Sequence, residues 1–420
     1  MKETESLVRP GTFLIPREGA DWAAWACVAC DQFTSQPQYW QEAAQQVGHK
    51  PSTLKLIVPE CYLQEAAARI PKAHAHMRDY LAQNLLTAGV TEGFILTERV
   101  TESGTRLGLI VLVDLEAYDY QPGSTSLIRP SEGTVLERLP PRVQVRQGAA
   151  LEMSHVLLLV NDEKRTVIEP LYEQRASLPK LYDFSLRQNG GHVTGYAVTQ
   201  PADIHAILGA LDALHADIAG NNPFLYAVGD GNHSLAAAKV CWEALRPALS
   251  KDQQLNHPAR FALVELENIH CDALCFEPIH RLVIGCDGAA LLAAWSAFRQ
   301  KEPLQEGDLD GVQSVTCICG TQEETVTLPG HSSTQALVAL QSFLDAWLPA
   351  HPEAMLDYVH GEDAVRALAA QDNAVAFLLP KPDKNGLFDT IRQHGALPRK
   401  TFSMGEAHEK RYYLETRKLL

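Results

Sequence analysis

The sequence predicts an α/β protein with mixed sheets and helices, arranged as two domains. Short apolar runs typical of strands alternate with stretches whose apolar residues recur at helical spacing, and turn residues separate them. The 420 residues are also more than one ordinary hydrophobic core accommodates. Hydrophobic residues make up 46% and charged residues 21% of the chain, which is typical of a folded protein rather than a disordered one.

The first part of the chain carries both patterns in turn. Residues 121–150 are rich in Pro, Gly, Ser and Arg, and we expect an ordered loop with short strands there. A loop of that length in a compact domain is either functional or disordered. The other predicted elements are a helix over 66–86, strands over 92–98 and 105–115 around a turn at 100–104, strands over 151–160 and 165–168, a helix over 203–219, a strand over 224–228, a helix over 233–245 and a strand over 259–266.

A change of pattern past residue 285 suggests a domain boundary. We expect a main α/β domain over 1–285 that carries the site and a smaller α/β domain over 286–394. A basic C-terminal segment over 395–420 should pack back on the first domain, and it should carry a helix from about 410 to 418. In the smaller domain we predict a helix over 289–298, a hairpin of 315–319 with 324–328, a helix over 334–347, and a strand, helix and strand over 355–360, 362–370 and 374–379.

The net charge and the cysteine content limit the classes of function that the sequence can have. The net charge of −15 repels phosphate backbones and argues against nucleic acid as a partner, although it leaves room for a local basic pocket. Nine cysteines cannot all pair, the first residues are polar and acidic, and no apolar run has membrane-spanning length. We therefore expect a reduced cytoplasmic protein that does not enter a membrane.

The sharpest local feature is a strand, turn and helix over 224–245. Gly229 and Gly231 permit positive φ and close approach of a ligand, and the free N–H groups of a helix start favour an anion. The turn is thus a candidate phosphate or carboxylate cradle. Asp230 would hold Mg²⁺ or accept a proton, and Asn232 or His233 would contact a phosphoryl oxygen. The alternative is that Asn232 only caps the helix.

A second candidate group lies in the Pro- and Arg-rich stretch. Glu132 stands among Arg129 and further arginines, which favour its ionised form, so it would act as a base or metal ligand while Arg129 holds an anion. The alternative is a surface loop with weak ion pairs.

Two further stretches offer cations for an anion. His280 and Arg281 adjoin in sequence and could bind phosphate, but a core histidine whose hydrogen bonds are satisfied is the commoner case for a residue such as His280. Residues 397–407 combine Arg399, Lys400 and Ser403 in an otherwise acidic chain, and the alternative is a solvated basic helix end.

The thiols at Cys27 and Cys30 have redox or zinc spacing. No second pair with structural-zinc spacing follows, so buried free thiols are the favoured interpretation.

Four motifs together resemble a known family. The combination is similar to the bacterial and archaeal domain-of-unknown-function family 1015 over nearly the whole chain. The motifs, in order, are Ile128-Arg129-Pro130-Ser131-Glu132-Gly133-Thr134, Gly229-Asp230-Gly231-Asn232-His233-Ser234, Pro278-Ile279-His280-Arg281 and residues 397–407.

The chain departs from that family at both principal motifs. The family commonly carries His-Glu-x-Thr, where this chain has Ser131 before the glutamate and keeps Thr134. It also carries Asp-Gly-His-His-Arg, where Asn232 and Ser234 stand in place of the first His and the Arg. If that Arg holds a phosphate in other members, another cation must do so in this divergent branch, and the candidates are Arg129, Arg281 and Lys400.

The resemblance extends to free-serine kinases of the ParB/sulfiredoxin-like superfamily. Their motif is similar to Asp-Gly-x-His, and they pair it with an upstream glutamate as base and with a nucleotide and Mg²⁺. The resemblance implies phosphotransfer on serine or phosphoserine, ATP or ADP as phosphoryl donor, and a ParB/sulfiredoxin-like core in the first domain.

The leading hypothesis is therefore a phosphoryl-transfer enzyme for a small anionic metabolite, either kinase or phosphatase. The alternative is a non-catalytic sensor that binds a phosphorylated metabolite in the same cradle. DNA binding by analogy with ParB conflicts with the charge of −15. The predicted catalytic residues are Glu132, Asp230 and His233, with Asp230 also the metal ligand, and the predicted binding residues are Arg129, Thr134, Gly229, Gly231, Asn232, Ser234, His280, Arg281, Arg399, Lys400 and Ser403.

Overall fold

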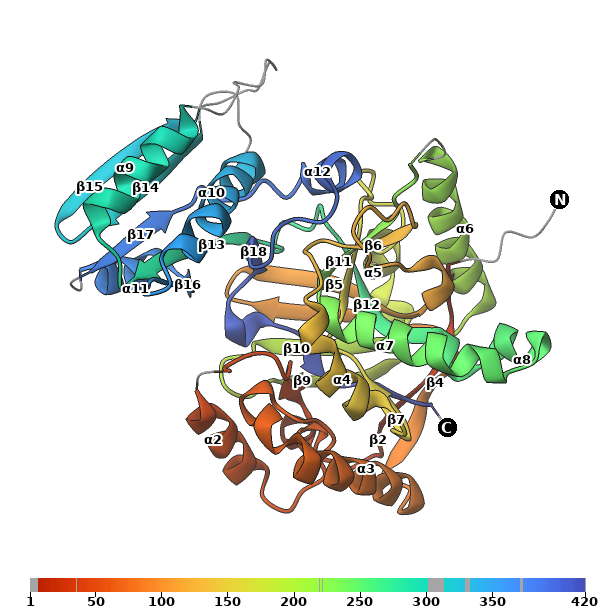
Figure 1. Cartoon of the computed structure of the whole chain (residues 1–420). Helices are drawn as coiled ribbons and strands as arrows, with labels where there is room; N and C mark the ends of the chain where they lie inside the picture. Colours follow the sequence, from red (N-terminus) through yellow and green to blue (C-terminus); the bar gives the residue numbers. More distant parts are fainter. Residues whose placement is uncertain are drawn as a thin grey trace. The chain divides into compact units, whose positions relative to one another are not determined.

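The mixed α/β fold predicted from the sequence is confirmed by the computed structural model, which describes residues 7–34, 36–218, 220, 222–300, 313–328, 333–370 and 373–419 (Figure 1). The chain divides into two compact units. The first consists of Met1–Leu274 with Gly405–Leu420, and the second of Cys275–Met404. The domain limits drawn from the sequence at 285 and 394 stay predictions.

The first unit combines a large sheet with helices and short 3₁₀ turns. Its elements are β1 (Val8–Arg9), β2 (Gly11–Pro16), α1 (Trp22–Trp25), β3 (Cys27–Val28), α2 (Pro37–Val47), η1 (Thr53–Lys55), η2 (Glu60–Glu65), α3 (Ala66–Ala82), β4 (Leu86–Thr101), β5 (Gly104–Asp114), η3 (Leu115–Ala117), β6 (Ile128–Pro130), η4 (Leu136–Arg138), α4 (Leu139–Arg146), β7 (Leu151–Met153), β8 (Leu157–Val160), α5 (Glu169–Glu173), η5 (Arg175–Ser177), β9 (Lys180–Ser185), β10 (His192–Val198), α6 (Pro201–Asp217), β11 (Tyr226–Asp230), α7 (Asn232–Leu245), η6 (Arg246–Ala248), α8 (Lys251–Asn256), η7 (Pro258–Arg260), β12 (Phe261–Asn268), η9 (Ala407–Glu409), β19 (Tyr412–Tyr413) and β20 (Thr416–Lys418).

Twelve strands of the described residues form one mixed sheet, whose main path is β6-β11-β8-β12-β5-β4-β2-β20-β7. Its central strands are buried on both faces because side chains alternate along a strand. In β4, Phe94 and Leu96 enter a core shared with α6 and α7, whereas Ile95 enters a second core that includes Trp40 of α2 and Tyr412 of β19. Burial on both faces explains why these strands read as continuous apolar runs.

The second unit is a smaller sheet with helices on both faces. Its elements are β13 (Phe276–Ile284), α9 (Gly288–Arg299), β14 (Gln313–Cys319), β15 (Gln322–Leu328), α10 (Ser333–Trp347), η8 (Leu348–Ala350), β16 (Met355–His360), α11 (Glu362–Ala369), β17 (Ala374–Leu378), α12 (Leu387–His394) and β18 (Phe402–Met404). The strand order is β15-β14-β17-β13-β16, and all neighbours are antiparallel. In β17, Val375 and Phe377 pack towards α9 and α10, whereas Ala376 packs towards α11.

The predicted strand over 165–168 is wrong. The buried carboxylate of Asp162 accepts the backbone N–H groups of Thr166 at 2.5 Å and Val167 at 2.9 Å, which removes these donors from any strand ladder. Arg165 also has a left-handed backbone with φ +55°. The segment is therefore a turn that leads into α5.

Two other local expectations are also corrected. The stretch over 121–150 was expected to be loop with short strands, but it contains α4, where proline occupies the helix start and needs no hydrogen-bonded N–H. The expected helix over 410–418 is absent from the described residues, which instead form β19 and β20.

No helix of the described chain has both the length and the apolar character needed to cross a membrane.

The C-terminal segment, residues 405–419, is held in the first unit by buried charges. The Arg411 guanidinium lies 3.2 Å from a carboxylate oxygen of Glu265 on β12 and 2.9 Å from one of Glu415. Glu265 also accepts a hydrogen bond from the Thr97 hydroxyl at 2.6 Å, and Glu415 accepts one from the Tyr182 hydroxyl. This network replaces the water that the carboxylates lose on folding.

Replacing Arg411 tests how much the buried network contributes. Arg411→Met removes the cation and leaves Glu265 and Glu415 buried, so we expect a loss of about 3–5 kcal/mol in the free energy of unfolding. Urea unfolding followed by circular dichroism measures it. The matched control is Arg69→Met, whose partner Glu65 is 58% exposed, and it should cost less than about 1 kcal/mol. Equal losses in the two variants would contradict this account.

Glu267 gives the first unit a pH dependence. Burial raises the pKa of Glu267 from 4.5 to about 7, although the charge of Arg106 opposes the shift. Between these pKa values the folded chain holds a proton that the unfolded chain has released, so stability falls as the pH rises through this window. We expect Glu267→Gln to reduce the fall in melting temperature between pH 4.5 and 7. Glu173→Gln, at an exposed position, is the control and should follow the wild type.

Candidate functional site

Two parallel strands end at the same edge of the large sheet and bring the two principal motifs together. In β6 and β11, Arg129 is aligned with Ala227 and Pro130 with Val228. The residues that follow both strands therefore share one edge, which is where open α/β sheets commonly bind ligands. Ser131 joins the strands there, because its backbone N–H and its hydroxyl both donate to the Val228 carbonyl, at 3.1 and 2.6 Å.

The α7 turn, residues 229–233, connects β11 to α7. Gly231 has φ +78° and precedes the first helical residue. A Cβ at this position would lie 3.0 Å from the Val156 Cα and 3.4 Å from a ring carbon of His155. Both the backbone conformation and the limited space around this residue therefore favour glycine. Gly229 lies where the register between β11 and β8 shifts.

Asn232 does not cap α7. The helix begins at Asn232 itself, and its N-cap residue is Gly231, which has no side chain to accept a backbone N–H. The Asn232 Oδ1 atom is buried and finds no hydrogen-bond partner among the residues that the structure describes. The capping interpretation is therefore wrong.

Lys410 supplies a cation to the α7 turn. Its Nζ lies 3.1 Å from Oδ2 of Asp230, and both side chains are largely buried, at 8% and 17% exposure. The other oxygen of Asp230 accepts the N–H of Gly231 at 2.9 Å. The Lys410 backbone carbonyl accepts a hydrogen bond from Arg99 at 2.7 Å, which fixes this part of the C-terminal segment. Lys410 was visible in the sequence only as part of a basic stretch.

The loop after β6 contacts the start of α7. The Nε2 atom of His233 accepts the backbone N–H of Val135 at 3.1 Å. Glu132 and Thr134 in the same loop are half-buried, and the Thr134 hydroxyl oxygen is enclosed without a hydrogen-bond partner in the described part of the chain. The structure thus brings Glu132, Thr134, Asp230 and His233 into one region.

Arg129 faces the opposite end of β6. Its guanidinium donates to the Ser126 carbonyl at 2.6 Å, to Oδ1 of Asn222 at 2.5 Å and to the Pro223 carbonyl at 2.7 Å. The side chain also lies over the Phe224 ring. These contacts join the chain segments that lead into β6 and β11, and the anion-binding role of Arg129 stays a prediction.

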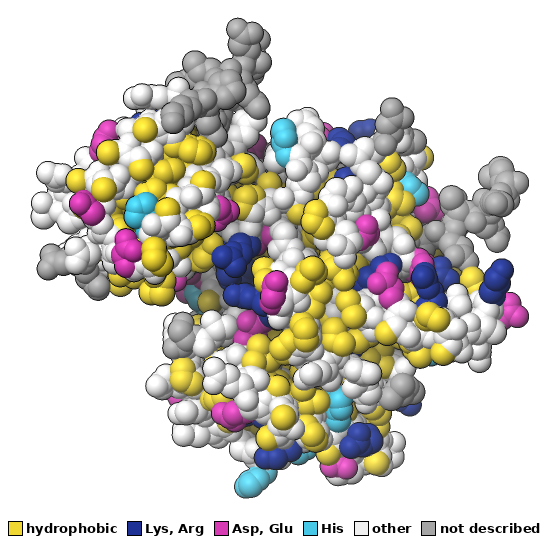
Figure 2. Space-filling view, viewed as in Figure 1, with side chains coloured by type: hydrophobic (Ala, Val, Ile, Leu, Met, Phe, Trp, Pro, Cys, Tyr) yellow, Lys and Arg dark blue, Asp and Glu magenta, His cyan; other side chains and the backbone are white. Residues whose placement is uncertain are grey.

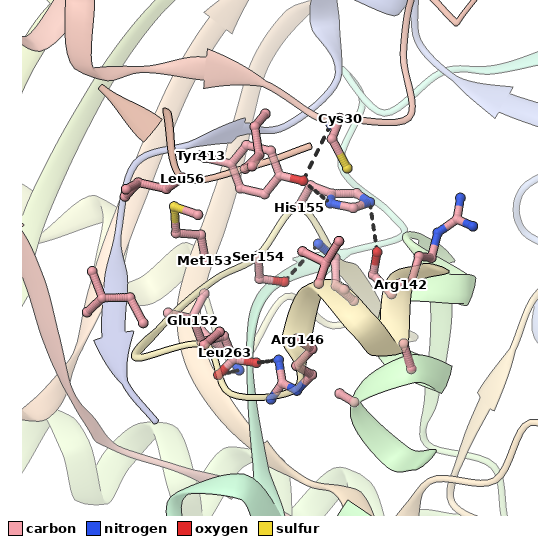
Figure 3. A pocket seen from close by; sticks show the side chains of 18 of the residues that line it. Cys30, Leu56, Arg142, Arg146, Glu152, Met153, Ser154, His155, Leu263 and Tyr413 are labelled. Atoms are coloured by element: carbon pink, nitrogen blue, oxygen red, sulfur yellow. Dashed lines mark hydrogen bonds and ion pairs between the residues drawn. The ribbon is translucent and has the colours of Figure 1, made fainter. Parts of the chain in front are cut away.

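A buried cluster that the sequence did not indicate lies beside the α7 turn (Figure 3). His155 is 4% exposed, and its Nδ1 is hydrogen-bonded to the Tyr413 hydroxyl at 2.7 Å. Its Nε2 lies 3.4 Å from the Ser234 hydroxyl on α7 and 3.5 Å from Oδ2 of Asp31. These residues come from four distant parts of the sequence, and apart from Ser234 no local pattern marks them.

The cluster holds Asp31 as an anion. Burial by itself raises the pKa of Asp31, but the charge of His155, hydrogen bonds from His155 and Gln32, and the charge of Lys410 together lower it well below its usual range. Lys410 therefore acts on both Asp31 and Asp230, so these two carboxylates share one lysine.

The remaining predicted residues belong to the second unit. Arg281 is fully buried, donates to Oε1 of Gln341 at 2.8 Å and to the Lys400 carbonyl at 2.9 Å, and lies over the Tyr358 ring. His280 is buried and accepts the Leu379 N–H at 3.1 Å, and burial lowers its pKa. Arg399 and Lys400 are exposed and Ser403 is half-buried. Their roles in ligand binding stay predictions.

A magnesium ion at this site stays a prediction. No group of three or more His, Cys, Asp or Glu side chains with metal-binding geometry occurs in the described residues. Mg²⁺ usually takes one or two carboxylates together with water and substrate phosphates, and Asp230 and Glu132 offer such oxygens. All nine cysteines are free, and burial raises the pKa of Cys30 to about 12, which does not favour a thiolate.

Several solved structures are similar to this chain at low identity. They include a conserved hypothetical protein from Pyrococcus furiosus, with 13% identity, coverage of 74% of this chain and 95% of that one, and a TM-score of 0.35. SbnI with a C-terminal truncation from Staphylococcus aureus has 10% identity, coverage of 73% and 82%, and a TM-score of 0.36. A free serine kinase in complex with AMP has 12% identity, coverage of 74% and 92%, and a TM-score of 0.37. Likeness at this level carries no argument for a shared activity.

The family is defined by sequence. No curated protein matches the chain. The model of the DUF1015 family, described as protein of unknown function, matches residues 14–415. The match includes the residues of the α7 turn, the loop after β6 and Lys410, and it confirms the family predicted from the four motifs. The chain therefore belongs to the DUF1015 family.

Proposed function

We propose that this protein is a phosphoryl-transfer enzyme that acts on a small metabolite, with the transferred group bound at the α7 turn. One observation carries the proposal: Asp230 and its partner Lys410 lie at the start of α7, and Glu132 follows β6 on the same edge of the sheet, where β6 and β11 end. Base, metal ligand and cation are the three roles that positioning and charge neutralisation of a phosphoryl group require.

The start of α7 favours a phosphate for electrostatic reasons. The first N–H groups of a helix have no intrahelical acceptor, and the helix dipole places partial positive charge there. Gly231 lets the backbone approach a ligand closely, and the Lys410 ammonium adds a full charge. Asn232 and His233 are the first two helical residues, and their N–H groups would contact phosphoryl oxygens.

The chemistry follows from these positions. Glu132 would accept the proton of the attacking hydroxyl group, or of water in a phosphatase, as its oxygen bonds to phosphorus and the leaving oxygen departs. Asp230 would hold Mg²⁺, which shields the negative charge of the phosphoryl oxygens. Lys410 would offset the charge that builds up on the leaving oxygen. ATP or ADP is the proposed donor in the kinase form.

Free serine and O-phosphoserine are the first substrates to test. Their selection rests on the similarity of residues 131–134 and 229–234 to the motif of free-serine kinases. A buffer with Mg²⁺ and L-serine plus ATP or ADP, and a second buffer with Mg²⁺ and O-phosphoserine alone, separate kinase from phosphatase by ³¹P NMR.

Glu132 and Asp230 should control turnover. We expect Glu132→Gln and Asp230→Asn each to lower kcat at least about 100-fold, because the first removes the base and the second a metal ligand. Glu137→Gln, at an exposed position in the next turn of chain, is the control and should retain activity. Turnover that is retained in both variants would contradict the catalytic roles assigned to Glu132 and Asp230. Ligand binding without turnover in the wild type would favour the sensor.

Lys410 should control affinity for phosphate. Lys410→Met removes the cation at the α7 turn, and we expect the dissociation constant for inorganic phosphate to rise about tenfold or more, as measured by calorimetry. Lys410→Arg keeps the charge and should restore most of the affinity. Lys418→Met, on an exposed part of the same segment, is the control. Phosphate binding to Lys410→Met at wild-type strength would exclude this role.

A further inference from the structure

A cavity of about 120 Å³ lies in the first unit beside the α7 turn (Figure 3). Its wall is formed by α3, α4, α7, β7, β12, the turn η2, the residues that follow η1 and β7, and the C-terminal segment. Most of the wall is apolar. The principal apolar side chains are Leu56, Val58, Met77, Leu151, Leu235 and Leu263.

One end of the cavity is polar and adjoins the proposed phosphate position. Ser234, His155 and Tyr413 line it there, and Ser234 lies in the first turn of α7, two residues after Asn232. The hydrogen bonds between His155 and the hydroxyl groups of Ser234 and Tyr413 hold the ring in place. A ligand in the cavity would therefore direct its polar end at His155 and Ser234.

The charged side chains of the wall are matched to one another. Arg142 pairs with Glu60, and Arg146 lies 2.5 Å from Glu152. Burial raises the pKa of Glu152, but Arg146 and Arg417 outweigh this effect and lower it, so the carboxylate is ionised and engaged. The body of the cavity thus presents apolar surface with paired charges, which suits an uncharged apolar group.

We propose that this cavity binds the apolar body of the substrate, and that the substrate is a small amphipathic alcohol or its phosphate ester. The cavity is somewhat smaller than a cavity of about 150 Å³ that holds benzene, so the body has about five or six carbon atoms. Its hydroxyl or ester oxygen lies at the polar end. The position of the phosphoryl group rests on the proposed function, whereas the apolar body rests on the cavity alone.

This assignment distinguishes the substrate from serine. The serine side chain has one carbon atom and leaves the apolar wall uncovered. Each additional buried methylene strengthens binding about fourfold. A branched five-carbon alcohol should accordingly bind about 50-fold more tightly than ethanol.

NMR of the methionine methyl groups tests the proposal by measuring alcohol binding to the wild-type protein. The chain has five methionines, and two of them, Met77 and Met153, line the cavity. The methionine methyl groups are labelled with ¹³C, and the variants Met77→Leu and Met153→Leu identify the two signals by their loss. In the wild-type protein, 3-methylbutan-1-ol should shift the signals of Met77 and Met153. Met355 and Met404, in the second unit, should stay unshifted at the same alcohol concentration.

A pair of variants on α4 controls the site of binding. Val145 lines the cavity, so Val145→Phe should fill part of it and weaken the alcohol-induced shifts at least tenfold. Val143, on the same helix, does not belong to the wall, and Val143→Phe should preserve them. If Val145→Phe does not fold, the wild-type protein still tests the proposal. The test is then whether the alcohol shifts the signals of Met77 and Met153 and leaves those of Met355 and Met404 unchanged.

Three outcomes separate this proposal from the proposed function. Saturable shifts confined to Met77 and Met153 support the cavity as the binding site. No shifts, or equal shifts at all four methionines, overturn it. Shifts at Met77 and Met153 together with no binding of inorganic phosphate and no turnover of 3-methylbutyl phosphate support the cavity and count against phosphoryl transfer at the α7 turn.

Discussion

The pairing of buried charges in the C-terminal segment with the first unit is the constraint on which the candidate site depends. A charge removed from water is stable only with a partner. Glu409 accepts hydrogen bonds from Ser103, Arg411 pairs with Glu265, and Lys410 pairs with Asp230. A shift of the segment by one residue would break these pairs together, so the same interactions that secure the chain also place Lys410 at the α7 turn.

The charges around the α7 turn suggest how a ligand would be accommodated. Asp31 and Asp230 share the single cation of Lys410. An anionic ligand gains from Lys410 and from the helix start, but the two carboxylates repel it. A divalent cation that accompanies the phosphate would balance this repulsion, which agrees with the carboxylate oxygens of Asp230 and Glu132 as its ligands.

Local patterns were sufficient for much of the fold and for part of the site. The two-sided burial of β4, β5 and β12 follows from continuous apolar runs, and the α7 turn follows from its two glycines. The strand over 165–168 could not be excluded from the sequence because the side chain of Asp162, rather than a neighbouring strand, binds the backbone there. The prediction of a helix over 410–418 is wrong because buried ion pairs hold that segment in an extended conformation.

The unforeseen members of the site depend on contacts between distant parts of the chain. Asp31, His155 and Tyr413 meet one another and the predicted Ser234 through β3 paired with β19 and β7 paired with β20. A buried polar residue looks the same in a sequence as an exposed one, and a histidine carries no mark of its eventual partner. The pairing of motifs across β6 and β11 was foreseeable only as a resemblance to family motifs, since their alignment depends on the sheet.

The position of Lys410 and Tyr413 so late in the chain has a consequence for biosynthesis. A ribosome adds residues in order, and β6, β11, α7 and the cluster residues Asp31 and His155 all emerge before the C-terminal segment. Until that segment arrives, Asp230 lacks Lys410, Glu265 lacks Arg411, and Glu152 has Arg146 but lacks Arg417. Assembly of the site is therefore the last event in the maturation of the first unit, and a chain interrupted before residue 410 would be incomplete in both its chemistry and its packing.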